Sequence, residues 1–254
     1  MKSALITGGA RGIGFATAQG LMADGWQVAI LDRDSDALAE ALAELPGAIG
    51  LDVDVSIPND VLRAVAEVAE AFGRLDGLVN NAGVADFGPI RDTTYDRWQR
   101  VMRTNLDGPF LMTQAFTDLL AADGGGAVVN ITSISGLRAS TLRVAYGTFK
   151  AALAQLTLQQ AAELGELGIR VNAVAPGPVA TKLAMAVHSP EIIAAYHDAL
   201  PLNRYGKEEE IAAAITFLLS DKASFITGQI LAADGGFEAV GIGLPALRAA
   251  AKGI

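Results

Sequence analysis

Several residue types that carry chemistry are absent from this chain or scarce in it. It has no cysteine, which excludes disulfides, thiol catalysis and cysteine-based metal sites. Its two histidines, His188 and His197, are too few to favour a zinc site. We therefore expect no metal and no redox chemistry based on sulfur.

Positive charge is also in short supply. There are 19 Lys and Arg against 28 Asp and Glu, which leaves a formal net charge of −9 with no basic stripe to offset it. An acidic surface repels phosphate backbones and anionic membranes. No apolar run approaches membrane-spanning length, and a strand-like run that begins at Ser3 leaves no room for a signal or transit peptide. We expect a cytoplasmic protein that binds neither nucleic acid nor membrane.

Strand-like apolar runs alternate with longer helical patterns along the whole chain, and no linker or charge block interrupts them. This alternation predicts one domain over residues 1–254, an α/β fold of the Rossmann type: a doubly wound parallel sheet of about seven strands with helices on both faces. The strands are near-continuous apolar runs because both faces of such a sheet are buried. The predicted strands are Ser3–Ile6, Val28–Leu31, Ala48–Val53, Gly77–Val79, Ala127–Ile131, Arg170–Ala175 and Ile230–Ala232.

A glycine-rich turn follows the first strand-like run, where residues 7–14 read TGGARGIG and open a helical pattern. Glycines at this spacing allow a tight turn, close approach of the backbone to a pyrophosphate, and close packing of helix on sheet. The N-terminus of the helix then faces the phosphates with unpaired N–H groups. The residues expected to contact the cofactor here are Gly8, Arg11, Gly12, Ile13 and Gly14.

The second strand-like run ends in Asp32, eighteen residues after Gly14. A carboxylate at this place accepts hydrogen bonds from the ribose hydroxyls of NAD and repels the 2′-phosphate of NADP. NAD is therefore the expected cofactor. Arg33 and Arg11 keep NADP open as the alternative, since arginine is the residue that accommodates this phosphate.

Three residues form a candidate proton-transfer group. Tyr146 and Lys150 are four apart at the start of a helical pattern, so they share one face of the helix. A fixed positive charge within about 4–6 Å favours phenolate and lowers the pKa of a phenol, which makes Tyr146 a usable acid and base. Ser133 ends the fifth strand-like run, where an open α/β sheet places its ligand, and can hold a substrate oxygen. Thr132 and Ser135 are rival hydroxyls, and strand alternation puts Thr132 on the opposite face.

Five motifs in this order resemble the short-chain dehydrogenase/reductase family over nearly the full length. They are TGGARGIG at 7–14, NNAG at 80–83, Asn105 within TNL, Ser133 with Tyr146 and Lys150, and PGPVAT at 176–181. The resemblance implies a catalytic tetrad of Asn105, Ser133, Tyr146 and Lys150, with Asn105 organising a water that relays protons to Lys150. It also suggests a homotetramer with the Tyr146 helix in an interface.

Further cofactor contacts are implied by the resemblance alone. Asp54, in the pair Asp54–Val55, is expected at the adenine, and Lys150 at a ribose hydroxyl. The remaining expected contacts are Asn81, Ala82 and Gly83 in the cofactor groove, and Pro176, Gly177, Val179 and Thr181 around the nicotinamide.

The substrate side is less well marked. Residues 182–200 resemble a short mobile lid of the family. Arg143, three residues before Tyr146, would favour a carboxylate, sulfonate or phosphate if it faces inward, whereas an exposed or interface arginine is the plainer interpretation. The other candidates are Asp86, which can reach a polyol hydroxyl, with Ser135, Arg138 and His188.

The chain continues past the point where members of this family usually stop. Residues 237–254 either cross a symmetry axis to close a neighbouring subunit's pocket or form a frayed tail.

These features predict an NAD-dependent oxidoreductase that interconverts a secondary alcohol of polyol, sugar or hydroxy-acid type and its carbonyl. The nearest alternative is an NADPH-dependent 3-oxoacyl carrier-protein reductase, against which Asp32 argues. From other classes come a non-catalytic NAD-binding or sensing protein, and an epimerase or dehydratase acting on a nucleotide sugar. The former does not need both Ser133 and Tyr146, and the latter typically has a longer C-terminal domain.

Overall fold

Seven strands form one parallel sheet in the computed structural model, which describes residues 1–182, 185, 188–240, 245, 250 and 251. The strand order is β3-β2-β1-β4-β5-β6-β7, and the order reverses between β1 and β4. This arrangement confirms the predicted doubly wound α/β fold. The strands are β1 (Ser3–Thr7), β2 (Gln27–Asp32), β3 (Ile49–Asp52), β4 (Gly77–Asn80), β5 (Ala127–Ile131), β6 (Arg170–Pro176) and β7 (Ile230–Ala233).

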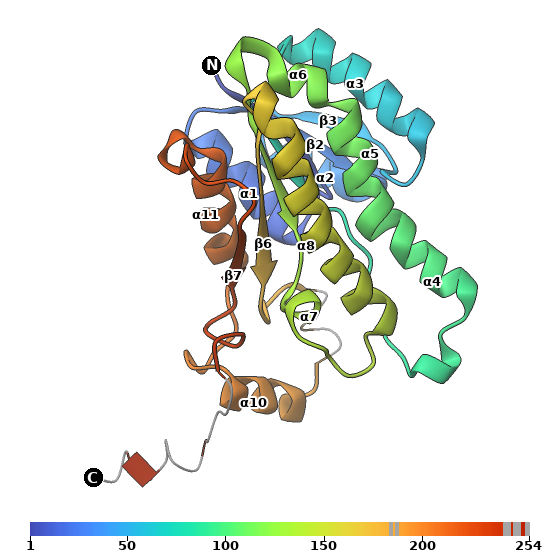
Figure 1. Cartoon of the computed structure of the whole chain (residues 1–254), viewed down its shortest axis with the longest axis vertical. Coiled ribbons are helices and arrows are strands. Elements are labelled where there is room, and N and C mark those ends of the chain that lie inside the picture. Colours follow the sequence, from blue (N-terminus) through green and yellow to red (C-terminus); the bar gives the residue numbers. More distant parts are fainter. Residues whose placement is uncertain (183–184, 186–187, 241–244, 246–249, 252–254) are drawn as a thin grey trace.

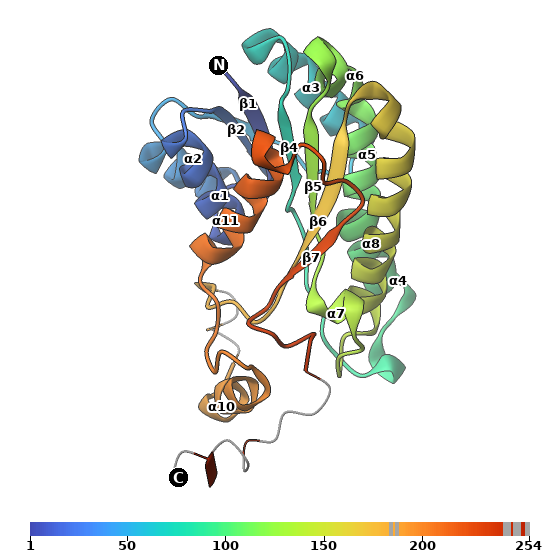
Figure 2. The same cartoon turned by 60° about the vertical axis from the view of Figure 1, so that its left-hand side comes forward.

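Two layers of helices cover the sheet (Figure 2). One layer holds α1 (Gly12–Ala23), α2 (Ser35–Glu44) and α11 (Glu208–Leu219), and α1 packs closely along α11. The opposite layer holds α3 (Pro58–Phe72), α4 (Tyr95–Met102), α5 (Gly108–Ala115), α6 (Thr117–Ala121) and α8 (Val144–Leu164).

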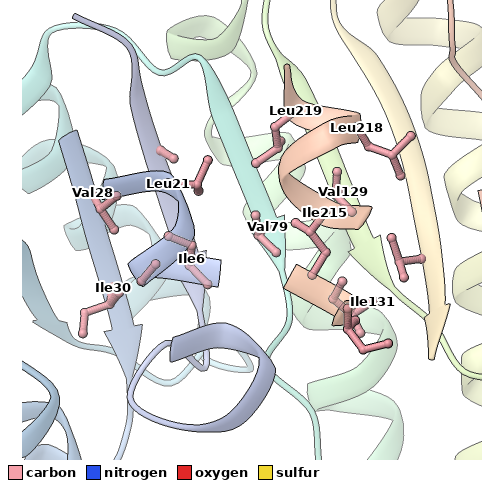
Figure 3. Close-up of a cluster of buried hydrophobic side chains, with 14 of the residues drawn as sticks. Ile6, Leu21, Val28, Ile30, Val79, Val129, Ile131, Ile215, Leu218 and Leu219 are labelled. Carbon is pink, nitrogen blue, oxygen red and sulfur yellow. The ribbon is translucent and has the colours of Figure 1, made fainter. Parts of the chain in front are cut away.

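The hydrophobic core lies between each layer and the sheet. On the side of the first layer, three side chains project from neighbouring strands of the sheet: Ile6, Ile30 and Val79. They point toward Leu21 of α1 and Ile215 of α11 (Figure 3). All five residues of β1 and of β5 are buried, so both faces of these strands contribute to the core. Burial on both faces is the reason why the strands read as continuous apolar runs.

Helix boundaries follow local capping chemistry. The Asp34 side chain accepts a hydrogen bond from Ala37 N at 3.1 Å, which caps α2 at its start. The long helix α8 begins at Val144, so Tyr146 lies within the first turn of this helix.

Short elements gather at the carboxyl ends of the strands (Figure 1). These are α7 (Ile134–Leu137) after β5 and α10 (Pro190–Ala199) after β6. The predicted lid, 182–200, therefore contains α10, whereas its residues 183–184 and 186–187 lie outside the described part. Most of the extension 237–254 also lies outside it. Among the described helices, none is long and apolar enough to span a bilayer.

A buried chain of polar side chains ties α8 to the sheet. Asn80 Nδ2 on β4 donates to Asn130 Oδ1 on β5 at 2.8 Å and to Thr113 Oγ1 on α5 at 3.1 Å. Asn130 Nδ2 in turn donates to Thr157 Oγ1 at 2.9 Å and Gln160 Oε1 at 3.1 Å, both on α8. Because the surroundings are apolar, these bonds hold α8 in one register over β5.

Replacing Asn130 with alanine should remove the centre of this chain. The Asn130→Ala variant leaves polar groups of Asn80 and Gln160 buried without a partner, so we expect a loss of about 2–4 kcal/mol in unfolding free energy. Urea denaturation measures this. The matched control Asn59→Ala, at an exposed position of α3, should change stability by less than about 0.5 kcal/mol. Equal stability of the two variants would contradict a structural role for the chain.

Candidate active site

The glycine turn between β1 and α1 is too crowded for side chains at one key position. A Cβ on Gly14 would lie 2.3 Å from Gly8 O and 2.6 Å from Asn81 Nδ2, so only glycine fits there. Gly8 and Gly12 both have φ of +61°, a conformation that other residues avoid. The turn thus brings its backbone close to the end of β4, as a dinucleotide cradle requires.

The N-terminus of α1 is open to an anion. Arg11 occupies the N-cap position in an extended conformation, and no side chain caps the first turn. The free N–H groups and the positive end of the helix dipole could hold a pyrophosphate. Ile13 itself packs against the core, so its contribution to such a site is limited to its backbone.

Thr7 and Asn81 join the carboxyl ends of β1 and β4. The Thr7 hydroxyl accepts from Asn81 N and Ala82 N, both at 3.0 Å, and donates to Val79 O at 3.2 Å. Asn81 Nδ2 donates to Thr7 O and Gly8 O, both at 2.9 Å. Asn81 therefore shapes the glycine turn through its side chain. The crevice lies at the point where the strand order reverses, which is the usual ligand site of an open α/β sheet.

Asp32 lies beside the glycine turn at the end of β2. Its carboxylate accepts from Ala10 N at 3.3 Å and Asp34 N at 3.2 Å. Both arginines that could accept a 2′-phosphate have carboxylate partners: Arg11 pairs with Asp34, and Arg33 pairs with Asp54 at 3.4 Å. The local charge next to Asp32 is therefore balanced rather than positive.

Asp54 and Val55 follow β3. Burial of the Asp54 carboxyl opposes its ionisation, but hydrogen bonds from Ser56 and the charge of Arg33 outweigh burial and lower its pKa. Val55 is buried in the core, where its Cγ2 would lie 2.8 Å from a Cβ on Gly108. The Val55 side chain is thus unavailable to a ligand, and only its backbone could reach one.

Asn105 and Lys150 meet at Gly83. A Cβ on Gly83 would lie 3.3 Å from Asn105 Oδ1 and 3.5 Å from Lys150 Nζ. Asn105 is fully buried in a π-helical segment, Arg103–Asp107, and both ends of its amide bond the backbone of Val84: Oδ1 accepts from Val84 N at 2.8 Å, and Nδ2 donates to Val84 O at 2.9 Å. Lys150 Nζ donates to Ile131 O at 2.7 Å. These bonds anchor the segment 81–84 against α8.

Tyr146 and Ser133 complete the group at the end of β5. Burial raises the pKa of Tyr146 above its ordinary value, while hydrogen bonding with Ser133 and the charge of Arg143 act in the opposite direction. Burial lowers the pKa of Lys150, which is 4% exposed, to about 8. The net shift of the Tyr146 pKa is thus upward, whereas the sequence predicted a pKa lowered by Lys150. The Lys150 ammonium lies 5.8 Å from the centre of the Tyr146 ring and donates its hydrogen bond to Ile131 O, and burial dominates the pKa of both groups.

The rival hydroxyls have other partners. Thr132 Oγ1 donates to Val174 O at 3.0 Å, away from Tyr146. Ser135 Oγ, predicted as a substrate contact, accepts from Ser140 Oγ at 3.1 Å and is buried. Ser133 is thus the hydroxyl that the structure brings to Tyr146.

The segment after β6 forms the opposite wall of the crevice. A Cβ on Gly177 would lie 2.6 Å from Asp234 Cα, so the backbone passes directly against the end of β7. Val179 is buried and bridges to Gly206, and its carbonyl accepts from Thr181 N at 2.8 Å. Pro176, Gly177, Val179 and Thr181 therefore line one continuous edge.

Two predicted substrate residues form ion pairs within the chain. The Asp86 carboxylate, whose side chain is 6% exposed, binds the guanidinium groups of Arg97 and Arg100, which lower its pKa. Arg138 donates to Glu238 O at 2.6 Å and pairs with the Glu238 carboxylate. Asp86 thus anchors its own loop to α4, and Arg138 fastens the C-terminal segment. Their roles as substrate contacts stay predictions, and any substrate would have to compete with these partners of opposite charge.

Arg143 and His188 lie together near Tyr146. Arg143 is half-buried, and its Nη2 donates to Tyr196 Oη at 3.2 Å. His188 Nδ1 is 2.9 Å from Tyr205 Oη, and burial together with the charge of Arg143 lowers the pKa of His188. Arg143 is therefore turned toward Tyr196 rather than fully exposed.

Sequence reasoning missed two aromatic residues at this place. The ring of Phe87 contacts Tyr146 edge-on, with centroids 5.9 Å apart, and Tyr196 comes from α10. No spacing relates either residue to Tyr146 along the chain. Such contacts leave no periodic pattern in the sequence, because they form where separate loops converge.

Comparison with known proteins identifies the family. The family model described as enoyl-(acyl carrier protein) reductase matches residues 8–238. The chain belongs to the short-chain dehydrogenase/reductase family. Members of this family bind a nicotinamide cofactor, and the chain is accordingly an oxidoreductase that acts on CH–OH groups.

Relatives of this dehydrogenase/reductase match it over most of their length. It is 39% identical to the 2-(S)-hydroxypropyl-CoM dehydrogenase 3 of Xanthobacter autotrophicus, over 92% of this chain and 96% of the relative. It is 38% identical to the galactitol 2-dehydrogenase (L-tagatose-forming) of Cereibacter sphaeroides, over 92% of this chain and 94% of the relative. A short-chain dehydrogenase/reductase structure from Mycobacterium ulcerans superposes with a TM-score of 0.91 at 36% identity, covering 94% of this chain and 90% of that one.

The Thr7 hydroxyl should be required for cofactor binding. Thr7→Val keeps the shape but leaves the N–H groups of Asn81 and Ala82 without their acceptor, so we expect roughly tenfold weaker NADH binding. Thr7→Ser retains the hydroxyl and should bind within about threefold of the unmodified protein. Titration of NADH fluorescence measures both. Equal affinities for the two variants would show that the cross-link does not shape the cofactor crevice.

Proposed function

We propose that this enzyme oxidises a secondary alcohol of polyol, sugar or hydroxy-acid type with NAD and catalyses the reverse reduction of the carbonyl. The observation that carries the proposal is that Asn105 and Lys150 meet at Gly83, that Lys150 lies beside the Tyr146 ring, and that Tyr146 is hydrogen-bonded to Ser133. Asp32 flanks the glycine turn. When bound, the nicotinamide supplies a hydride acceptor at C4.

Tyr146 moves the proton in this proposal. In the direction of oxidation its phenolate takes the proton of the substrate hydroxyl, while Ser133 holds the substrate oxygen by a hydrogen bond. In the reverse direction the Tyr146 hydroxyl returns the proton to that oxygen. Because burial raises the pKa of Tyr146, the phenol is protonated at neutral pH, which favours reduction there and favours oxidation at alkaline pH.

Lys150 and Asn105 support the tyrosine. With a pKa of about 8, Lys150 exchanges a proton readily near neutral pH and can pass it to or from Tyr146. Asn105 fixes Val84 through both ends of its amide, and thereby fixes the segment that carries Gly83 beside the Lys150 ammonium. The proton then leaves through a water held near Asn105, as the family resemblance implies.

Asp32 supports NAD as the cofactor. Its carboxylate lies at the end of β2, and the arginines on either side of it are paired with Asp34 and Asp54. A 2′-phosphate at this place would meet a negative charge with no free guanidinium among the described residues nearby. We extend the proposal to a cytoplasmic homotetramer with α8 in an interface, as the resemblance suggests, and gel filtration tests the assembly.

The description of the matching family model, an acyl carrier protein enzyme, favours the carrier-protein alternative. It requires NADPH and an acidic protein partner. The net charge of −9 opposes such a partner, so the alternative depends on a local basic patch.

Loss of the Tyr146 hydroxyl should abolish turnover without affecting cofactor binding. Tyr146→Phe should lower kcat at least about 10³-fold, because no other group near Ser133 replaces the phenol. The assay follows absorbance of the reduced nicotinamide at about 340 nm against polyols, aldoses, hydroxy acids and simple secondary alcohols. Tyr95→Phe, at an exposed position on α4, is the control and should be unaffected. Substantial activity in Tyr146→Phe would refute the assigned role. Tight NADH binding without turnover of any alcohol would favour a non-catalytic binding protein.

Charge at Asp32 should decide between NAD and NADP. Asp32→Asn keeps the shape and removes the charge, so the preference for NAD over NADP in kcat/KM should fall by about tenfold or more. Asp36→Asn, on the exposed first turn of α2, removes the same charge one turn away and should leave the preference unchanged. A preference for NADP in the unmodified enzyme would overturn the cofactor assignment and favour the carrier-protein reductase.

A further inference from the structure

Arg143, three residues before Tyr146, has no carboxylate partner in the part of the chain that the structure describes. Among the described residues it forms no ion pair, and it donates one hydrogen bond, to the neutral Tyr196 hydroxyl. This is unusual for a half-buried guanidinium, which is normally paired. Nearby arginines do have carboxylate partners: Arg97 and Arg100 with Asp86, Arg138 with Glu238, and Arg204 with Glu210.

The guanidinium of Arg143 is held in place by aromatic groups. It lies 4.4 Å from the centre of the Phe87 ring, a cation–π contact that fixes its plane without neutralising its charge. Tyr196, which accepts its hydrogen bond, is packed in turn by His188, with ring centroids 5.5 Å apart, and by Tyr205, at 5.6 Å. The charge is thus fixed in position before any ligand arrives.

Arg143 and Tyr146 both lie against the ring of Phe87. Arg143 is the N-cap residue of α8, one helical turn before Tyr146, and Phe87 contacts both side chains. The charge of Arg143 also acts on Tyr146 and on His188. A small substrate whose hydroxyl lies at Tyr146 therefore has Arg143 within reach of its other end.

We propose that Arg143 and Tyr196 form a subsite for an anionic group of the substrate. The inference rests on the proposed function and narrows its substrate to a secondary alcohol that carries a carboxylate, sulfonate or phosphate. A guanidinium has five N–H donors in a fork that matches such oxyanions, and the described residues accept only one bond from it. The Tyr196 hydroxyl accepts from Arg143 and keeps its own proton to donate to the anion. Phe87 offers an apolar face to the carbon skeleton between the two ends.

Tyr196 gives the subsite a second consequence. It belongs to α10, whereas Arg143 begins α8, so an anion bound by both side chains connects the lid helix to the catalytic helix. Binding of the charged group then also positions the reacting carbon against Tyr146. A neutral alcohol does not make this contact. We therefore expect it to have a higher KM than the anionic substrate, with a smaller difference in kcat.

Matched substrate pairs test the proposal. The pairs are 3-hydroxybutyrate and its methyl ester, which share the reacting hydroxyl and differ in charge. Two further arms, 2-hydroxypropanesulfonate and glycerol 3-phosphate, distinguish sulfonate and phosphate from carboxylate. Steady-state kinetics with saturating NAD should give the unmodified enzyme a kcat/KM at least about tenfold higher for one of the anions than for the neutral ester.

Variants then assign the preference to the guanidinium. In Arg143→Gln, kcat/KM for the preferred anion should fall roughly 10- to 100-fold, mainly through KM, while the value for the ester stays within about threefold. Arg143→Lys keeps the charge and should recover part of the loss. Tyr196→Phe should show a smaller loss, again confined to the anion. Lys2→Gln removes one positive charge from an exposed pair with Asp221 at the opposite end of the sheet and should change neither value.

The outcomes separate this subsite from the dehydrogenase activity. Equal use of anion and ester by the unmodified enzyme, or an equal loss for both in Arg143→Gln, would overturn the subsite and leave the dehydrogenase proposal intact. If no alcohol is oxidised at all, the anions are tested for a thermal shift of the NADH complex. A shift that Arg143→Gln abolishes supports the subsite even then, and the absence of any shift overturns it.

Discussion

The hydrogen bonds between Thr7 and Asn81 are the constraint on which both halves of the site depend. They bind the carboxyl ends of β1 and β4 where the strand order reverses, and they fix the glycine turn on one side. On the other side the same segment continues through Gly83 to Val84, whose backbone Asn105 holds. A shift at Thr7 would therefore reach the cofactor cradle and the proton-transfer group together.

Burial, rather than ion pairing, has the largest effect on the pKa values of Tyr146 and Lys150. The pKa of Tyr146 is raised and that of Lys150 is lowered. Both shifts favour the neutral form, because a low-dielectric environment disfavours either charge. The unneutralised charge that does act on the phenol belongs to Arg143. The same positive charge that would attract an anionic substrate therefore also favours the phenolate form of Tyr146.

Locally encoded features could be predicted, and contacts between distant loops could not. The pair Tyr146 and Lys150 follows from helical spacing, and the cap at Asp34 follows from its position before α2. The ion-pair partners of Asp86 and Arg138 could not be predicted because they are remote: Arg97 and Arg100 reach Asp86 from α4, and Glu238 lies 100 residues from Arg138. A free carboxylate and a paired one are identical in sequence.

The sequence by itself determined the strand pattern, the glycine turn, the place of Asp32 and the placement of Tyr146 and Lys150 on one helix face, because each depends on residue type at a fixed local spacing. The tertiary structure alone decided which charges are neutralised. It turned Arg143 inward toward Tyr196 and Phe87 while it supplied carboxylates to the arginines around it. The energy of an ion pair depends on the distance between the two charges. For residues far apart in the sequence, that distance is set only when the chain folds.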